Sequence, residues 1–266
     1  MKDAMLYEKL SDNRVTCNLC NHRCTIKDGN YGICGVRQNI DGSLLSLVYD
    51  KIVASHIDPI EKKPLFQFYP GSRAYSVATV GCNFKCKHCQ NFDISQLPRE
   101  KRGYIIGEKI SPEEIVKKAD SSGCQSIAYT YTEPTIFFEL AYDTAKIAHR
   151  KGIKNIFVSN GFMTPEALIE ISPYLDGINI DLKAFNDTFY KEICGGRLEP
   201  VLEKQNQRFA MTVFNANKKP VGRDSGKSSP AITLAVKPGS SYYIKLDVRH
   251  APVEKKPQYR LYLKCE

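Results

Sequence analysis

Four short apolar runs alternate with helical patterns in the middle of the chain. Residues 73–80, 125–130, 154–159 and 177–182 have the length and the β-branched content of buried strands. Residues 135–151 carry apolar side chains at helical spacing, and Gly152 stands where a helix commonly ends. Strands that alternate with helices predict βαβ units and a parallel sheet, whose functional residues gather at the carboxyl ends of the strands.

Local signals mark where the other helices begin. The segment Ser-Pro-Glu-Glu predicts a helix that starts at Ser111, with Glu114 completing a capping box. Thr164 followed by proline predicts a second start, and residues 187–194 form a short helical pattern that ends at a Gly-Gly pair.

The pattern changes after about residue 202. Residues 244–248 and 259–263 alternate between apolar and polar side chains, which is typical of half-buried antiparallel strands, and the polar segment 215–230 resembles a linker. We therefore predict an α/β core over residues 71–203, a Cys-rich N-terminal extension over residues 1–70 and a β-like tail over residues 204–266.

Composition and charge narrow the function classes. The chain has 266 residues with 42% apolar and 25% charged side chains, lacks an apolar run long enough to span a membrane, and shows no secretory signal at its start, so we expect a cytoplasmic protein. The net charge of +9 suggests nucleic-acid binding, but residues 1–200 carry 25 basic against 24 acidic side chains and residues 201–266 carry 13 against 5. Because no nucleic-acid-binding module accompanies this tail, the charge marks a boundary near residue 200 rather than a nucleic-acid partner.

Cysteines supply the candidate chemistry. Seven of the ten fall into two groups, and in a reducing cytosol grouped thiols are more often metal ligands than disulfides. Cys124 and Cys194 lie apart and are interpreted as small core residues, although Cys194 stands near the end of the fourth strand, where a site would lie.

The sharpest motif is Cys82-x3-Cys86-x2-Cys89, directly after the first predicted strand. Three thiolates from one loop can occupy three corners of a [4Fe–4S] cluster and leave the fourth iron open. Zinc is the main alternative, although structural zinc normally has four protein ligands and His88 could supply the fourth only awkwardly. Three buried cysteines in a turn are the remaining interpretation.

The sequence around this motif resembles a known family. The loop GCNFKCKHCQN is similar to the cluster loop of radical SAM enzymes, and the longer string from DPIEKKPLFQFYPGS through this loop is similar to the radical SAM member of the AmmeMemoRadiSam system, which is related to pyruvate formate-lyase activating enzymes. The resemblance covers about residues 17–203. It implies a partial (β/α) barrel, S-adenosylmethionine (SAM) bound to the open iron, and reductive cleavage of SAM to methionine and a 5′-deoxyadenosyl radical. It also implies a reductant such as ferredoxin or flavodoxin and a substrate that is a protein or another partner of that system.

The resemblance assigns cofactor contacts to the first two strand ends. His88 stands where the family has an aromatic residue that packs beside adenine. Thr132 and Glu133 match the glycine-glycine-glutamate-proline segment, in which the glutamate accepts from the methionine ammonium; Tyr131 and Thr132 replace the two glycines. An ordinary helix entry with a solvated carboxylate is the alternative.

The third and fourth strand ends carry the remaining predicted contacts. Asn160 follows the third strand and could contact the ribose or the methionine, or form a plain turn with the following glycine. Asp181 and Lys183 end the fourth strand and resemble the Asp-Leu-Lys segment of the activating enzymes, in which the lysine pairs with the methionine carboxylate. A salt-bridged strand end is the alternative.

A second candidate metal site lies near the N-terminus. Its members, the cysteines of the N-terminal extension, are Cys17, Cys20, Cys24 and Cys34. Four thiols with one C-x2-C step suit tetrahedral zinc or an auxiliary iron–sulfur cluster, and reduced structural or redox cysteines are the alternative.

These patterns together predict a radical SAM enzyme, a glycyl-radical-activating-like oxidoreductase, that uses a [4Fe–4S] cluster and SAM to abstract hydrogen from an unidentified substrate. The family would continue after residue 203 with further βα units, which the tail does not show, so the tail is either a replaced domain or the product of a shifted reading frame. The alternative function is therefore a catalytically degenerate iron–sulfur or zinc-binding protein without a complete SAM pocket.

Overall fold

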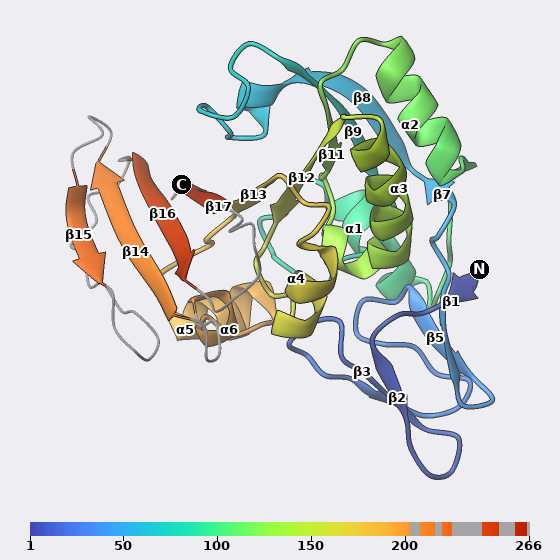
Figure 1. Cartoon of the computed structure of the whole chain (residues 1–266). Helices are drawn as coiled ribbons and strands as arrows, with labels where there is room; N and C mark the ends of the chain where they lie inside the picture. Colours follow the sequence, from blue (N-terminus) through green and yellow to red (C-terminus); the bar gives the residue numbers. More distant parts are fainter. Residues whose placement is uncertain (203–207, 216–219, 225–240, 250–258, 265–266) are drawn as a thin grey trace.

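A five-stranded sheet lies at the centre of the molecule (Figure 1). This computed structural model describes residues 1–202 and, beyond them, the backbone of residues 208–215, 220–224, 241–249 and 259–264. The sheet has the order β13-β12-β11-β9-β8, with bounds β8 Ala54–Pro59, β9 Arg73–Ala78, β11 Ser126–Tyr129, β12 Lys154–Ser159 and β13 Gly177–Ile180.

The sheet confirms the predicted parallel core. Strands β9, β11, β12 and β13 occur where the apolar runs predict them, and all are paired in parallel. Their residues are almost entirely buried, as expected for strands covered on both faces. Strand β8 was not predicted; it pairs antiparallel with β9 and so brings part of the N-terminal 70 residues into the main sheet.

Helices begin at the predicted caps. In α2 (Pro112–Ser121), Ser111 Oγ accepts from the backbone N–H of Glu114 at 3.2 Å, and a Glu114 carboxylate oxygen accepts from the N–H of Ser111 at 2.8 Å. Helix α4 (Pro165–Ile171) is capped by Thr164. Helices α2 and α3 (Phe138–Arg150) lie side by side against the sheet, α2 over β9 and β11 and α3 over β12.

Two predicted helices differ in detail from their patterns. The first begins with the 3-10 turn η2 (Pro134–Phe137), because the Glu133 side chain accepts from the N–H of Thr135 and shapes the entry to α3. The second consists of α5 (Asp187–Phe189) followed by the π-helical turn η3 (Tyr190–Cys194), and Gly195 ends it with a φ of 74°. Helices α1 (Phe92–Glu100) and α6 (Glu199–Leu202) and the short turn η1 (Ile60–Lys62) were not predicted.

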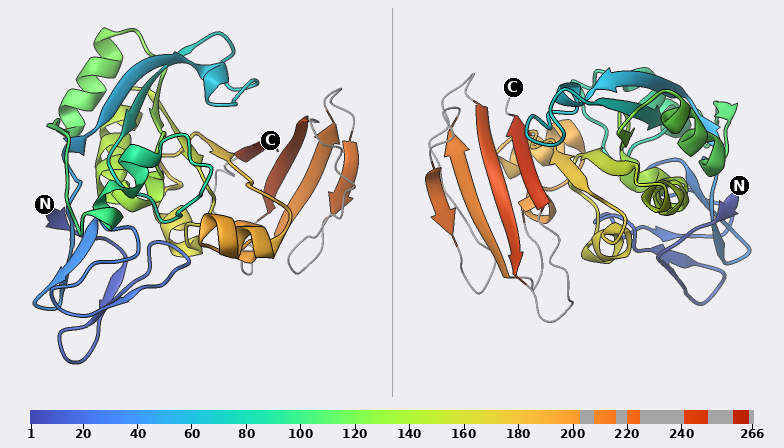
Figure 2. Two further views of the ribbon diagram at one scale, coloured as in Figure 1. Left: turned by 180° about the vertical axis from the view of Figure 1, so that it is seen from behind. Right: turned by 45° about the horizontal axis from the view of Figure 1, so that its top comes forward.

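The N-terminal segment forms small antiparallel sheets beside the main sheet (Figure 2). Strands β1-β6-β5 make one and β2-β3-β4 another, while β7 pairs with β10; the bounds are β1 Lys2–Asp3, β2 Tyr7–Lys9, β3 Val15–Cys17, β4 Thr25–Ile26, β5 Arg37–Ile40, β6 Ser43–Ser46, β7 Lys51–Ile52 and β10 Glu108–Lys109. The buried Arg37 of β5 forms a salt bridge with the buried Glu139 of α3, which ties this segment to the core.

A separate antiparallel sheet follows the core, in the order β15-β14-β16-β17. Its bounds are β14 Arg208–Asn215, β15 Pro220–Asp224, β16 Ser241–Arg249 and β17 Tyr259–Lys264, so both alternating segments of the tail coincide with strands. Most of the predicted linker, 216–219 and 225–230, lies outside the described residues, as does Cys265. In the described part of the chain, no helix has the length and apolar character needed to cross a membrane.

Candidate functional site

Three cysteines lie in the loop that leaves β9, which we call the cluster loop (residues 79–91). The backbone N–H of Phe84 donates to Cys82 Sγ at 3.4 Å, and Cys89 Sγ lies 3.4 Å from Ser95 Oγ in α1. Burial raises the pKa of Cys82, and the nearby charges of Glu133, Cys86 and Cys89 raise it further. The three cysteines therefore lie in one partly buried loop, and burial favours the protonated thiol of Cys82 until a cation replaces its proton.

Glu133 lies at the carboxyl end of β11 and is 3% exposed. One carboxylate oxygen accepts from Ser159 Oγ at 2.8 Å and from both the N–H and the hydroxyl of Thr135, and the other accepts from the N–H of Asn160 at 2.7 Å. Burial still raises the pKa of Glu133 against these hydrogen bonds. Because Glu133 is buried, its carboxylate is not the solvated one of the alternative interpretation, although it does cap the helical turn η2. A cationic group bound beside this carboxylate would offset the cost of burying its charge.

Asn160 connects Glu133 to the cluster loop. Its backbone N–H binds Glu133, its side-chain amide donates to Asn83 Oδ1 at 2.7 Å, and its own Oδ1 accepts from the N–H of Phe162 at 3.0 Å. The residue is 7% exposed and follows β12 directly. The ends of β9, β11 and β12 therefore form one hydrogen-bonded rim.

Asp181 and Lys183 follow β13 on the same rim. Lys183 Nζ lies 3.1 Å from an Asp181 carboxylate oxygen, and the other Asp181 oxygen accepts from Asn179 at 2.8 Å. Burial by itself lowers the pKa of Lys183, but Asp181 and the thiols of Cys86 and Cys82 raise it overall. The ammonium of Lys183 thus lies near the cluster loop, and it also forms the strand-end salt bridge that the alternative interpretation described.

Comparison with known sequences bears directly on this rim. Residues 76–204, from the middle of β9 to just beyond α6, match the family model described as the Radical SAM superfamily. This segment is a radical SAM domain. Membership in the superfamily implies a [4Fe–4S] cluster, SAM and radical chemistry, and it leaves the substrate open.

The similarity to one relative covers more of the chain than this domain does. An uncharacterized protein of Methanocaldococcus jannaschii is 48% identical over 203 residues, which cover 76% of this chain and 59% of that protein. A probable GTP 3',8-cyclase of Methanococcus vannielii is 30% identical over 128 residues, or 46% of this chain and 40% of that protein. The chain thus spans about half the length of the curated relatives it matches.

Among solved structures, TYW1 with a lysine-pyruvate adduct bound is similar to 48% of this chain and 49% of that chain. The identity is 20% and the TM-score is 0.32, a likeness too weak to bear on fold or function.

The residues of the radical SAM domain fit the cofactors that the superfamily implies. Three thiols on one loop are the usual donor set of a cluster with one open iron. Next to them, the side-chain amide nitrogen of Asn83 is buried and has no hydrogen-bond partner among the described residues. A buried donor without a partner costs free energy, so this atom is available to an acceptor that enters the site.

Tyr131 and Thr132 replace the glycines of the resembled motif, yet the backbone keeps a glycine-like shape. Tyr131 has a φ of 61°, a left-handed conformation that is uncommon for a bulky residue. Its carbonyl accepts from the Asn91 side chain at 2.8 Å, its hydroxyl binds Asp58, and Thr132 Oγ1 donates to the carbonyl of Thr79 at 2.8 Å. These contacts hold the strained turn at the rim.

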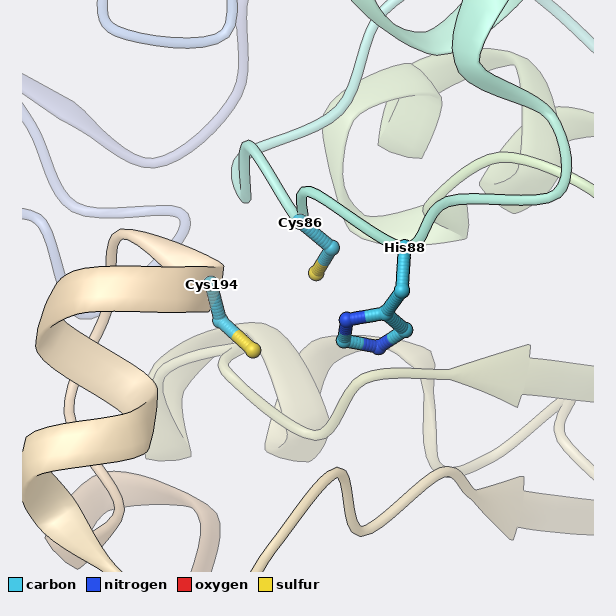
Figure 3. A group of neighbouring side chains, drawn as sticks. All are labelled: Cys86, His88 and Cys194. Carbon is cyan, nitrogen blue, oxygen red and sulfur yellow. The ribbon is translucent and has the colours of Figure 1, made fainter. Parts of the chain in front are cut away.

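His88 and Cys86 form a compact group with a cysteine outside the motif (Figure 3). The candidate ligand atoms of Cys86, His88 and Cys194 all lie within 4.8 Å of one another, and the three side chains point toward one another. His88 is exposed and packs against Phe189, with ring centroids 5.7 Å apart. Cys194 is fully buried at the end of η3 and hydrogen-bonds with Cys86. The core-residue interpretation of Cys194 is therefore incomplete, because this thiol also borders the cluster loop.

Two further residues near the rim carry no sequence-based assignment. Asp58 of β8 is 5% exposed and accepts from Lys63 at 2.6 Å, from Ser76 at 2.9 Å and from Tyr131. These partners hold the pKa of Asp58 well below its usual range despite burial. The second residue, Asn83, lies between Cys82 and Cys86 of the cysteine motif. Asp58 belongs to the string that carries the family resemblance, and that was the only signal available for it.

The four N-terminal cysteines also gather in space. Burial raises the pKa of Cys20, and the nearby charges of Cys17, Cys34 and Cys24 raise it as well. Cys17 ends β3, Cys20 and Cys24 lie between β3 and β4, and Cys34 lies between β4 and β5. The structure thus brings together a set that the sequence could only group by spacing.

Proposed function

We propose that the chain is a radical SAM enzyme that cleaves SAM reductively and uses the resulting radical to abstract hydrogen from a second substrate. When bound, the [4Fe–4S] cluster supplies the electron that breaks a carbon–sulfur bond of SAM and yields methionine and a 5′-deoxyadenosyl radical. The observation that carries the proposal is the rim itself. Asn83 of the cluster loop binds Asn160, whose backbone N–H binds the buried carboxylate of Glu133 on a neighbouring strand end, and the ammonium of Lys183 lies near the same loop.

The two charged rim residues are complementary to the two charges of the methionine part of SAM. Glu133 would accept from its ammonium, a charge-assisted hydrogen bond, and Lys183 would pair with its carboxylate. Asn160 holds Glu133 in place through its backbone and joins it to the cluster loop through Asn83. Thr132 contributes by fixing the turn at Thr79, and His88, from its exposed place beside Phe189, would pack against the adenine.

The subgroup, the hydrogen donor and the reductant are proposed from sequence resemblance. The string from Asp58 through the cluster loop supports a member of the AmmeMemoRadiSam group, with a protein glycyl residue or another macromolecule as the hydrogen donor and ferredoxin or flavodoxin as the reductant. The second candidate is a degenerate cluster protein, and one observation favours it: the sequence after residue 203 lacks the pattern of further βα units.

One experiment separates these two functions. The full chain is reconstituted anaerobically with iron and sulfide, and dithionite and SAM are added. Formation of 5′-deoxyadenosine, measured by chromatography with mass detection, is the expected result. A [4Fe–4S] spectrum without deoxyadenosine would overturn the catalytic proposal in favour of the degenerate protein.

Glu133→Gln should weaken SAM binding. Hydrogen bonds to charged groups contribute about 1.5–3 kcal/mol, so the loss of the carboxylate charge should raise the KM for SAM by roughly 10- to 150-fold. Deoxyadenosine formation over a range of SAM concentrations measures this effect. The control is Glu113→Gln on the exposed face of α2, which should leave the KM unchanged. An unchanged KM in Glu133→Gln would show that this carboxylate does not bind the SAM ammonium.

A further inference from the structure

The four N-terminal cysteines meet where three short segments pack together. Cys17 ends β3, and its backbone N–H donates to the carbonyl of Cys24, just before β4, at 2.9 Å. Cys34 lies in the turn before β5, and a Cβ atom at Gly32 in that turn would lie 3.7 Å from Cys34 Sγ and 3.4 Å from the Ile26 side chain. Cys17 and Cys34 are 6% and 8% exposed, and Cys20 and Cys24 pack against the same core at intermediate exposure.

Backbone donors are directed at three of these four sulfur atoms. The N–H of His22 donates to Cys20, that of Ile33 to Cys24, and that of Val36 to Cys34. In two of the three cases the donor lies two residues after the cysteine, and Phe84 stands in the same relation to Cys82 in the cluster loop. Burial raises the pKa of these three thiols overall, and the N–H groups oppose part of that rise by favouring the thiolate, which is the form of cysteine that binds metal ions.

The buried guanidinium of Arg37 lies near the N-terminal cysteines. Arg37 is 1% exposed; burial by itself lowers the pKa of its guanidinium, and the charge of Glu139, followed by those of Cys17 and Cys34, raises it overall. Its Nε has no hydrogen-bond partner among the described residues, although another nitrogen of the group binds Glu139. Four thiolates around a divalent cation carry a net negative charge, and a positive group beside them offsets part of it.

We propose that Cys17, Cys20, Cys24 and Cys34 bind one structural zinc ion. A closed set of four thiolates with a C-x2-C step is the donor set of structural zinc. Among the described residues, Cys86, His88 and Cys194 are the one set of three possible metal ligands whose ligand atoms all lie within 4.8 Å of one another. No three of the N-terminal sulfur atoms are that close together. Zinc would draw them together, since Zn–S bonds of about 2.3 Å place neighbouring sulfur atoms just under 4 Å apart.

The zinc would hold the loop that supports the cofactor rim. Within residues 17–24, His22 Nε2 lies 2.8 Å from the carbonyl of Asn83 in the cluster loop, and the N–H of Asn21 donates to the carbonyl of Phe162 at 2.9 Å. Thr164 Oγ1 donates to the carbonyl of Asn18 at 2.7 Å. The loop thus contacts both the cluster loop and the turn after Asn160, and fixing its two ends at a metal would fix those contacts.

The test uses the full chain without its radical SAM cluster. In a Cys82→Ala, Cys86→Ala, Cys89→Ala background, elemental analysis should find about one zinc per chain, as expected for a single four-thiolate site. Adding Cys20→Ala should remove most of this zinc, whereas adding Cys124→Ala, a buried cysteine outside both groups, should retain it. Because this background cannot form the proposed radical SAM cluster, the outcome does not depend on SAM cleavage.

Cobalt substitution keeps the test independent of how well the Cys20 variant folds. Co²⁺ bound by the background protein should show the ligand-field and sulfur-to-cobalt bands of a tetrahedral tetrathiolate site, and zinc should displace it. Iron and sulfide in place of zinc in the background protein would overturn the proposal in favour of an auxiliary cluster. Undiminished zinc in a folded Cys20→Ala variant, or absence of metal from the background protein, would also overturn it.

Discussion

Cys86→Ala should abolish assembly of the [4Fe–4S] cluster and, with it, deoxyadenosine formation. Cys86 is the middle cysteine of the motif that we propose as the ligand set, and its side chain points toward His88 and Cys194 (Figure 3). Loss of a residue that only supports a metal ligand costs roughly 10- to 100-fold in affinity or activity, so loss of a ligand itself should exceed that range. Iron and sulfide analysis, the visible spectrum and product formation measure the effect.

Cys194→Ala is the matched control, because Cys194 lies beside Cys86 but outside the three-cysteine motif. This variant should assemble the cluster with the iron content of the unaltered protein. If instead Cys194→Ala lost the cluster and Cys86→Ala kept it, the ligand set would be Cys82, Cys89 and Cys194. A full cluster in both single variants would show that the two thiols can replace each other.

Glu139→Ala should destabilise the cluster-free protein by about 3–5 kcal/mol. The salt bridge between Glu139 and Arg37 is buried on both sides, with side chains 0% and 2% exposed. Removing the carboxylate would leave the Arg37 charge buried without its partner, and it would also remove the acceptor of the Met5 N–H, which binds Glu139 at 2.7 Å. Urea unfolding followed by circular dichroism measures the change in the free energy of unfolding.

Two further variants show whether the unpaired charge causes this loss. Arg37→Met combined with Glu139→Leu removes both charges and fills their volume, so it should recover most of the stability. Glu113→Ala on the exposed face of α2 should change stability by no more than about 0.5 kcal/mol. A double variant no more stable than Glu139→Ala would mean that packing around α3, and not the unpaired charge, dominates the loss.

Much of the core was predictable from the sequence because its determinants are local. Apolar runs of strand length specify β9, β11, β12 and β13, and the Ser111 capping box specifies the start of α2. The edge strand β8 escaped prediction. Its residues include His56 and Asp58, and exposed positions along it give it no strand-like apolar pattern; its place in the sheet comes from pairing with β9.

The rim was predictable in part. Because the carboxyl ends of parallel strands share one edge, Glu133, Asn160 and Lys183 could be expected near Cys82, and the structure brings them there. The sequence shows Tyr131 in place of a glycine of the resembled motif and does not indicate its backbone conformation. Tertiary contacts with Asn91 and Asp58 hold Tyr131 in a left-handed conformation that is uncommon for a bulky residue.

The sequence by itself determined the elements of the core and the chemistry of its cluster loop, since spacing along one short segment is a local property. Apart from the rim shared by the parallel strands, the tertiary structure decided which distant groups meet. Arg37 and Glu139 are 102 residues apart, and Cys194 follows Cys86 by more than a hundred residues. Contacts of this kind depend on how sheets and helices pack, and packing is set by the whole buried surface, so no local pattern encodes them.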